Sequence, residues 1–352
     1  MNFKAVEQKF NDAEYMQKNF FDVEIKEEDG AKKLQERHIV DFASITLKKI
    51  NWYPDGLAFE INLTRDLIRK NPGLKKLQKL INNCSDAGLL TRQELVSMLP
   101  PLFLDVQDTD MVLDMCAAPG SKTSQMIESQ LGTRKDKAIV HMTGGVVAND
   151  ADGKRAYMLT HQLQRIVTTG MLVINHEGQH LPTMKMEGQH GGDNRFYFDK
   201  VLADVPCSGD GAIRKIPLKW KGWSSKDGCG LHIIQTLILE RSVQLTKIGG
   251  LILYSTCSLN PIENEAVVAE VIAKANAEVP GSLELVDIHN RFPGLIAHRG
   301  QDKWSVLIEK PEMKKHKQED SKKFKAEDLF HILDTYDEAK IEELNTPVKG
   351  TQ

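Results

Sequence analysis

The chain has 352 residues, of which 41% are hydrophobic and 27% are charged, and its formal net charge at pH 7 is −3. This length allows one full α/β core and a second, smaller unit. No apolar run approaches the roughly 18 residues that a membrane span needs, and the N-terminus lacks the apolar segment of a secretory signal. We therefore expect an intracellular protein that makes no use of a membrane.

The cysteines are odd in number, scattered, and without a C-x-x-C pair. Such a set supports neither a disulfide scaffold nor a zinc knuckle, so we expect no metal. Thiols that stay reduced remain available as nucleophiles. The five are Cys84, Cys116, Cys207, Cys229 and Cys257.

The two ends of the chain differ from its centre in their pattern of charged and apolar residues. Residues 1–51 form a charged extension without a clear assignment, whereas residues 52–104 carry apolar side chains at three- and four-residue steps, which predicts a mainly helical accessory region. Six bases against one acid between Arg65 and Lys79 fit either a phosphate-tracking surface or a solvated helix face. Residues 311–352 form a charged tail, in which spacing suggests one amphipathic helix through Leu329, Leu333, Tyr336, Ile341 and Leu344.

Between residues 105 and 310 short apolar runs alternate with segments of helical spacing. This alternation predicts an α/β fold, with a parallel sheet covered by helices on both faces. The predicted strands are Met111–Met115, Gly145–Asn149, Met171–Asn175, Lys200–Val205 and Leu251–Ser255, followed by a terminal pair at Leu283–Ile288 and Trp304–Glu309. The predicted helices are Ser121–Gln130, Gly153–Ile166, Leu231–Lys247 and Pro261–Ala277.

Two of the predicted strands run into a cysteine, Cys207 in DVPCSGDG and Cys257 in YSTCSLNPIENE. Open α/β folds build their active sites at the carboxyl ends of parallel strands, so two thiols at one edge indicate covalent chemistry. The alternative for a free cysteine is a small buried core residue, which fits Cys84 and Cys229 well.

The first predicted strand leads into VLDMCAAPGSKT, whose small residues let a ligand lie against the backbone beside the amides of a helix start. A P-loop needs glycine directly before the lysine, where Ser121 stands here, and a dinucleotide site needs three glycines where only Gly120 is present. The second strand ends in VVANDAD, which makes Asp150 a candidate ribose ligand or a helix N-cap. The pattern predicts one adenosine-sized ligand without a pyrophosphate.

These motifs, MVLDMCAAPGSKT, VVANDAD, ADVPCSGDG and YSTCSLNPIENEAVV, resemble in sequence and order those of the Nop/Sun-type RNA (cytosine-5) methyltransferases. The segment NWYPDGLAFEINLTRDLIRKNP is most similar to their eukaryotic tRNA-methylating branch. The resemblance implies a Rossmann-like, seven-stranded fold that binds S-adenosyl-L-methionine and methylates C5 of cytosine in RNA, with tRNA as the favoured substrate. The regions flanking the matching part look shorter than in that branch, so we expect tRNA affinity or site choice to suffer.

The resemblance also implies roles for individual residues. It assigns the ribose contact to Asp150 and the adenine edge to Glu177, where the family usually has Asp. It places Asp204 at the base and the cofactor, and gives Lys122 a part in positioning both. The remaining cofactor contacts fall to the loop residues Cys116, Ala117, Ala118, Pro119, Gly120, Ser121 and Lys122.

A thiolate that adds to C6 of cytosine makes C5 nucleophilic enough to take a methyl group. From the residues alone either cysteine fits this role, and Cys257 is favoured because the NPIE segment after it predicts a helix start whose positive end stabilises a thiolate. In the resembled family the cysteine at Cys257 is the nucleophile and that at Cys207 assists product release. The alternatives are a turn cap for Asp204 and a solvated helix residue for Lys122.

A paired cytosine must be unstacked before a thiol can reach C6, so RNA binding is a requirement. The segment after Cys207 offers cations and stacking faces, or else an ordinary basic surface loop, in Arg214, Lys215, Lys219, Trp220, Lys221 and Trp223. The rival function is an RNA-binding or regulatory relative with reduced catalysis. The basic cluster Lys314–Lys325 favours the nucleus over the cytoplasm, and the oligomeric state stays open.

Overall fold

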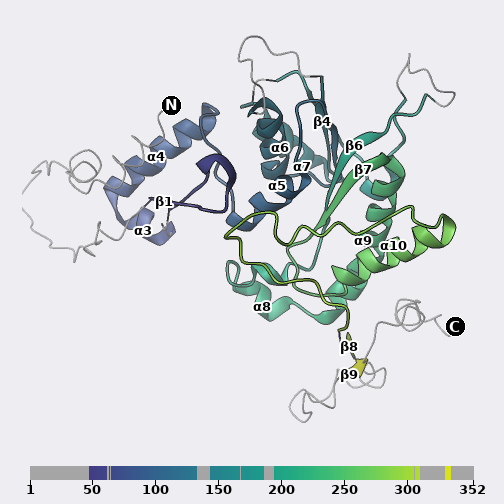
Figure 1. Cartoon of the computed structure of the whole chain (residues 1–352). Helices are drawn as coiled ribbons and strands as arrows, with labels where there is room; N and C mark the ends of the chain where they lie inside the picture. The colour runs from purple at the N-terminus through teal and green to yellow at the C-terminus, as the bar shows by residue number, and fades with distance from the viewer. Residues whose placement is uncertain are drawn as a thin grey trace, which may run out of the picture. The chain divides into compact units, whose positions relative to one another are not determined.

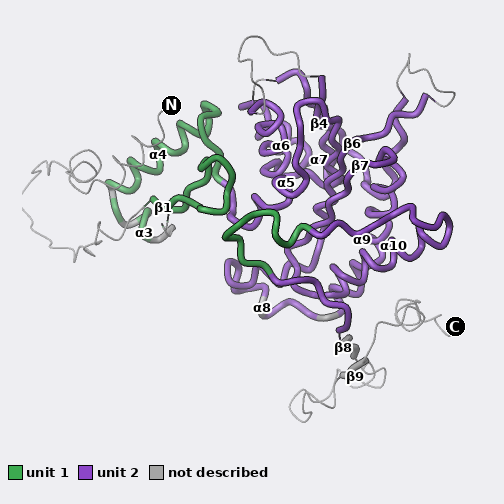
Figure 2. The backbone as a smooth tube through the Cα atoms, viewed as in Figure 1, with its two compact units in different colours: residues 1–92, 288–297 green, residues 93–287, 298–352 purple. Residues whose placement is uncertain are grey.

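The computed structural model describes residues 47–132 except 62 and 64, 143–185 except 167, 194–304, 306–309 and 330–333. The chain divides into two compact units, one of residues 1–92 and 288–297 and one of residues 93–287 and 298–352 (Figure 2). Among the described residues, every helix is too short or too polar to cross a lipid bilayer. The domain limits drawn from the sequence stay predictions.

The first unit combines a short antiparallel strand pair with two helices. Helix α4 begins after Asn71, whose side chain accepts hydrogen bonds from the first-turn amides of Gly73 and Leu74 at 2.9 and 3.2 Å. Leu74 and Leu77 are buried under α3, while the lysines between and after them are exposed. The elements are β1 (Leu47–Lys49), η3 (Pro54–Gly56), β2 (Phe59–Ile61), α3 (Arg65–Lys70) and α4 (Pro72–Asp86).

The predicted helical region therefore contains a strand as well. Gly56 and Asp55 both take positive φ angles, 64° and 56°, and the turn that they make brings β2 back along β1. The helical spacing begins only after β2. The expected basic surface lies on α3 and α4, where Lys75, Lys76 and Lys79 are exposed.

The second unit is built on a five-stranded parallel sheet with strand order β5-β4-β3-β6-β7. Figure 1 labels β4, β6 and β7 of this sheet. The sheet has the Rossmann-like arrangement, in which the strand order reverses beside the first strand and opens a crevice at the carboxyl ends. Leu113 in the central strand pairs with Val147 on one side and Val201 on the other. The strands are β3 (Met111–Asp114), β4 (Gly145–Asn149), β5 (Met171–Ile174), β6 (Phe198–Asp204) and β7 (Thr246–Ser255).

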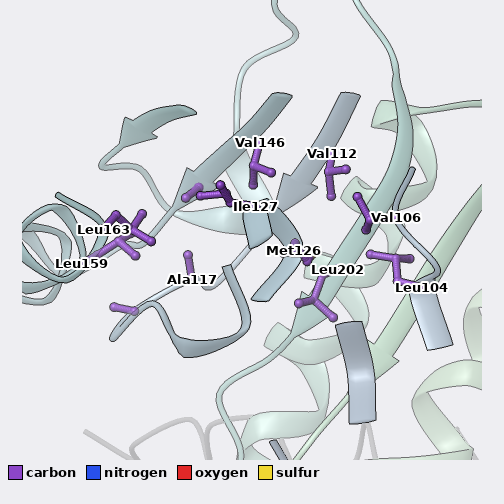
Figure 3. Close-up of a cluster of buried hydrophobic side chains, with 12 residues drawn as sticks. Leu104, Val106, Val112, Ala117, Met126, Ile127, Val146, Leu159, Leu163 and Leu202 are labelled. Carbon is purple, nitrogen blue, oxygen red and sulfur yellow. The ribbon is translucent and has the colours of Figure 1, made fainter. Parts of the chain in front are cut away.

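Helices cover both faces of this sheet, as the alternation predicts. One buried cluster joins Val112 and Val146 to α6 and α7, with Met126 and Leu159 among its members (Figure 3). The opposite face buries Leu113 and its neighbours against α9. The helices are η4 (Leu95–Met98), α5 (Leu99–Leu104), α6 (Ser121–Gly132), α7 (Gly153–Leu163), η5 (Gly178–His180), η6 (Asp210–Ala212), α8 (Leu218–Gly222), α9 (Ser225–Leu245) and α10 (Glu265–Glu278).

The main sheet has five strands in the described part of the chain, so the predicted count of seven is not confirmed. Leu283–Ile288 forms no strand, because the Asn276 side chain takes up both the N–H and the C=O of Leu283, which a neighbouring strand would otherwise pair. Strand β8 (Val306–Glu309) pairs antiparallel with β9 (Phe330–Leu333) in a separate sheet.

Strand β9 also corrects the helix predicted through Leu333, at least over the four residues that the structure describes. The rest of that predicted helix, the basic cluster Lys314–Lys325 and residues 1–46 lie outside the described residues.

Candidate active site

The loop after β3 lies against the ends of β4 and α7. Ala117 N donates to the carbonyl of Asn149 at 2.7 Å, and Ala118 N donates to Asp150 Oδ2 at 3.1 Å. Gly120 has a φ of +106°, and a Cβ there would lie 2.9 Å from Leu159 Cδ1. The loop therefore requires small residues for its own packing, and its backbone lines the carboxyl edge of the sheet.

Asp150 directly follows β4 and is 3% exposed. Its Oδ1 accepts from the amide of Asp152 at 3.1 Å, and Arg155 Nη2 lies 3.5 Å from its Oδ2. The helix N-cap is Asp152, whose side chain accepts from the amides of Lys154 and Arg155 in the first turn of α7. The N-cap alternative for Asp150 is therefore wrong, and its role toward a ribose stays a prediction.

Glu177 follows β5 at the same edge and is 63% exposed. Its carboxylate accepts from Gln179 Nε2 at 3.2 Å. The backbone before it is held by Asn149, whose side chain donates to the carbonyl of His176 and accepts from its amide, at 2.9 and 3.0 Å. The buried amide thus fixes the loop that carries Glu177 while leaving the carboxylate in solvent.

Lys122 and Asp204 form an ion pair across the crevice. Lys122 Nζ, in the first turn of α6, lies 2.7 Å from Asp204 Oδ2 at the end of β6. Asp204 Oδ1 accepts a hydrogen bond from Ser255 Oγ at 2.7 Å. The side chains are 18% and 27% exposed, so neither is a solvated surface group. The alternatives of a turn cap and a surface lysine do not describe this pair.

The two thiols in the loops that follow β6 and β7 lie side by side. Cys207 Sγ is 3.1 Å from Cys257 Sγ, and the backbone amide of Cys257 donates to Cys207 Sγ at 3.3 Å. Both cysteines are free, with Cys257 exposed and Cys207 half-buried. The structure therefore brings together the two cysteines that the motifs singled out, next to the Lys122–Asp204 pair.

The two thiols have opposite acidities. The hydrogen bond from Cys207 is the largest cause that lowers the pKa of Cys257, to about 6, against the opposing effect of burial. The positive charges of Lys219 and Lys122 lower it further, while Asp204 raises it. The same hydrogen bond and burial raise the pKa of Cys207. The pair therefore holds its protons unequally, with the pKa of Cys257 lowered and that of Cys207 raised.

The cause of this low pKa differs from the one that the sequence suggests. Helix α10 begins at Glu265 rather than Pro261, so Cys257 does not lie at its first turn. Asn260 Oδ1 accepts from the amide of Ile262 at 3.1 Å, and the resulting turn delays the helix. The hydrogen bond from the Cys207 thiol, and not the positive end of a helix, is thus the main cause that lowers the pKa of Cys257.

Glu263 is a residue that the sequence analysis did not single out. The structure buries it completely and surrounds its carboxylate with donors: Ser208 N at 2.7 Å, Ser208 Oγ at 2.5 Å, Ser258 Oγ at 2.8 Å and Gln235 Nε2 at 3.1 Å. Since Ser208 and Ser258 directly follow the two cysteines, one carboxylate joins both loops. No motif-level signal points to this role.

A second missed residue is Asp114, which ends β3 and is 1% exposed. Thr123 Oγ1 donates to its Oδ2 at 2.7 Å, and within the described part of the chain its Oδ1 has no hydrogen-bond partner. Burial is the largest cause that raises its pKa, to about 7. A charged residue at the end of an otherwise apolar strand is the signal that could have found it.

The other three cysteines are free and half-buried. Burial raises the pKa of Cys116 in the cofactor loop and of Cys229 in α9. Among the described residues no group of His, Cys, Asp and Glu could hold a metal ion.

The predicted RNA-contacting segment lies just after Cys207. Arg214, Lys215 and Lys221 are exposed, and Lys215 pairs with Glu94 at 2.6 Å. Trp223 is half-buried. Cations thus lie on the surface beyond the thiols, and contact with RNA stays a prediction.

Comparison with known proteins agrees with the motifs. A family described as 16S rRNA methyltransferase RsmB/F matches residues 101–292. The chain is 46% identical over 271 residues to the multisite-specific tRNA:(cytosine-C(5))-methyltransferase trm4b of Schizosaccharomyces pombe, covering 73% of this chain and 39% of that protein. It is 44% identical over 281 residues to the corresponding Saccharomyces cerevisiae enzyme, covering 77% and 40%.

A crystal structure of a methyltransferase homolog protein from Pyrococcus horikoshii is 28% identical, with a TM-score of 0.47 over 65% of this chain and 62% of that one. The matched part of the chain spans about two fifths of the length of each of the two fungal relatives. The family match covers more than half of this chain, including both cysteines and the Lys122–Asp204 pair. The resemblance inferred from the motifs is confirmed, and the chain belongs to the RsmB/F methyltransferase family.

Proposed function

We propose that this chain transfers a methyl group from S-adenosyl-L-methionine to C5 of a cytosine in RNA, and that the RNA is tRNA. The observation that supports this most is the pair Cys207 and Cys257, with sulfurs 3.1 Å apart, beside the ion pair of Lys122 and Asp204. The names of the two fungal relatives favour tRNA, whereas the family description names 16S rRNA. The test below therefore includes both kinds of RNA.

The loop after β3 fits the proposed methyl donor. Asp114, which precedes that loop, has in Oδ1 a buried acceptor without a partner among the described residues. A donor with an ammonium group and a ribose needs such acceptors. The residues that would hold it are Cys116–Lys122, Asp150, Glu177 and Asp204, and when bound it would supply an electrophilic methyl group.

Cys257 carries the first chemical step. Its thiolate adds to C6 of the cytosine, the C5–C6 double bond is lost, and the electron density gained at C5 makes that carbon nucleophilic. A pKa near 6 keeps Cys257 ionised at neutral pH, as an attacking thiol requires.

Asp204 and Lys122 would serve the base during that step. Addition at C6 builds negative charge toward N3 and O2 of the ring, which a donor or cation opposite the sulfur stabilises. Ser255 donates a hydrogen bond to Asp204 Oδ1 and Lys122 pairs with Oδ2, so these two contacts hold the carboxylate in one orientation. A carboxylate that accepts from the N4 amino group also distinguishes cytosine from uracil.

Cys207 completes the cycle. After methylation the C5 proton must leave and the bond between Cys257 and C6 must break, which restores the aromatic ring and frees the thiolate. The pKa of Cys207 is raised chiefly by its hydrogen bond to Cys257. That cause disappears once Cys257 is bound to carbon, so Cys207 can then release its own proton to solvent, and its thiolate can accept the proton that leaves C5 as the bond between C6 and the Cys257 sulfur breaks.

The test is methyl transfer by the chain itself. Unmodified tRNA and a fragment of small-subunit rRNA are each supplied in excess with methyl-labelled S-adenosyl-L-methionine, and 5-methylcytosine is located by bisulfite sequencing. We expect label in tRNA at cytosine C5 and none with Cys257→Ala. RNA binding without any methyl transfer would contradict the proposal and favour a relative with reduced catalysis.

The proposal includes a nuclear location, which rests on the basic cluster Lys314–Lys325 of the sequence. Replacing its lysines by glutamine in a fluorescently tagged chain is expected to move the signal out of the nucleus. A nuclear signal that survives this change would remove the basis for that part of the proposal.

A further inference from the structure

One lysine next to the thiols is held without a carboxylate. Lys219, in the short helix α8, donates through Nζ to the backbone carbonyls of Ser208 and Gly209 at 3.3 Å each, and its side chain is half-buried. No carboxylate of the described residues pairs with it. Lys122, by contrast, is 2.7 Å from Asp204, so a nearby negative charge offsets much of its field at the thiols.

Gly209 shows how close this ammonium lies to the nucleophile. A Cβ on Gly209 would overlap Lys219 Nζ and would lie 3.5 Å from Cys257 Sγ. The ammonium and the sulfur therefore flank the same small space. Gly209 has a φ of +69°, so glycine is required both for the turn and for this approach.

We propose that Lys219 is the cation that stabilises the Cys257 thiolate, a role that rests on the proposed function of Cys257 as the nucleophile. A thiolate that neighbouring groups shield from part of its water loses hydration, and an adjacent positive charge restores part of that free energy. Lys219 is thus a positioning residue that sets the charge state of Cys257.

The charges around the two cysteine loops make this cation necessary. Three carboxylates lie among these segments, because Glu263 joins both loops, Asp204 ends β6, and Asp210 Oδ1 accepts from the amide of Leu259 at 2.8 Å. Two lysines oppose them. Without Lys219, Lys122 would be the one lysine left, among the described residues, to offset these three carboxylates near the thiolate. The pKa of Cys257 agrees with this role. Among the causes that lower it, the charge of Lys219 comes second, after the hydrogen bond from Cys207.

The experiment measures the charge state of Cys257 directly. The chain is treated with iodoacetamide between pH 5 and 9, and alkylation of the Cys257 peptide is followed by mass spectrometry. With Lys219→Met we expect the midpoint of the rate profile to rise by about one pH unit and the rate at pH 6 to fall about fivefold, because the thiolate fraction drops from about one half to about one eleventh. Lys219→Arg should restore the midpoint, because it keeps the charge.

Two further variants separate charge from anchoring. Lys219→Gln can still donate to the carbonyls of Ser208 and Gly209 but carries no charge, so it should behave like Lys219→Met. Lys221→Met removes an exposed lysine of the same helix and should leave the midpoint unchanged. A normal midpoint in both Lys219→Met and Lys219→Gln would overturn the proposal, as would an equal shift with Lys221→Met.

The readout does not depend on methyl transfer. If the Lys219 variants shift the midpoint but the unmodified chain methylates no RNA, the proposed function fails and the assignment of Lys219 stands. If methylation proceeds and the midpoint does not move, the reverse holds. Thermal unfolding of each variant, expected within about 3 °C of the unmodified chain, ensures that folded protein is compared.

Discussion

The hydroxyl of Ser208 donates a hydrogen bond to Glu263 Oε2 at 2.5 Å. Through this contact the residue after Cys207 is joined to the segment that follows Cys257. Ser258 Oγ shares the same oxygen at 2.8 Å, so the two cysteine loops meet on one buried carboxylate. The short distance between the two sulfurs follows from this connection.

Glu263→Gln should therefore slow methyl transfer. An amide has one acceptor oxygen, so its NH₂ group would face donors that now meet a carboxylate, and one buried donor would be left unpaired at about 1–3 kcal/mol. We expect a fall in kcat of about a hundredfold with little change in the KM for the methyl donor. Glu265→Gln, which alters a carboxylate at the start of α10, is the control, and normal turnover by Glu263→Gln would show that the carboxylate does not position the thiols.

The two cysteines should give different products when each is removed. Cys257→Ala is expected to abolish methyl transfer, because no thiolate remains to add to C6. Cys207→Ala is expected to leave addition intact and to accumulate an RNA–protein adduct on a denaturing gel, since the step that frees the product is impaired. Cys84→Ala, in the other compact unit, should behave like the unmodified chain. Normal turnover by Cys207→Ala would mean that its release role is wrong.

The pH dependence of addition follows from the same pair. Cys257 must be ionised to attack, so with a pKa of about 6 the rate of adduct formation should fall as the pH drops below 6. Cys207→Ala removes the largest cause of that low pKa, so the profile should move to higher pH. Cys207→Ser keeps a hydroxyl donor and should move it less. Single-turnover adduct formation between pH 5 and 9 measures this, and identical profiles for all three proteins would contradict the assigned hydrogen bond.

The raised pKa of Asp114 predicts that the stability of the fold depends on pH. Its pKa is about 7 in the folded chain against the ordinary 3.8, so the folded state prefers the protonated form. The stability that this group contributes is complete below pH 4 and is lost as the pH rises through 7. Asp114→Asn should therefore raise the free energy of unfolding at pH 8, by up to about 4 kcal/mol at roughly 1.4 kcal/mol per pKa unit.

Urea unfolding at pH 4 and pH 8 measures this effect. The gain from Asp114→Asn should be present at pH 8 and largely absent at pH 4. Asp287→Asn changes an exposed carboxylate that is 63% accessible and should alter stability by less than about 0.5 kcal/mol at either pH. A loss of stability at pH 8 in Asp114→Asn would show that the carboxylate is held ionised.

The main sheet could be predicted because its strands are short apolar runs closed by turn residues. Gly145–Asn149 is a strand from the first to the last residue predicted, and three others differ by one or two residues at their ends. The fourth, β7, begins at Thr246, five residues before the predicted Leu251 and within the helix predicted to Lys247. The site followed from the same pattern, since the carboxyl ends of neighbouring parallel strands meet at one edge and bring Cys207 and Cys257 together.

What the sequence did not reveal depends on contacts between distant segments. The carboxylate of Glu263 is bound by side chains 28 and 55 residues away, and no local pattern records that convergence. The low pKa of Cys257 comes from a thiol 50 residues earlier rather than from the adjacent helix. The strand expected at Leu283 is absent because Asn276, a single side chain, occupies its backbone groups.

The central claim is that Cys257 bonds to C6 of the target cytosine. Replacing cytosine by 5-fluorocytosine in the RNA removes the proton that must leave C5, so the adduct of the unmodified chain should persist in the presence of the methyl donor. Protease and nuclease digestion followed by mass spectrometry should then find the nucleotide on the peptide that contains Cys257. A nucleotide on the Cys207 peptide, or no adduct from a chain that methylates ordinary RNA, would contradict the account.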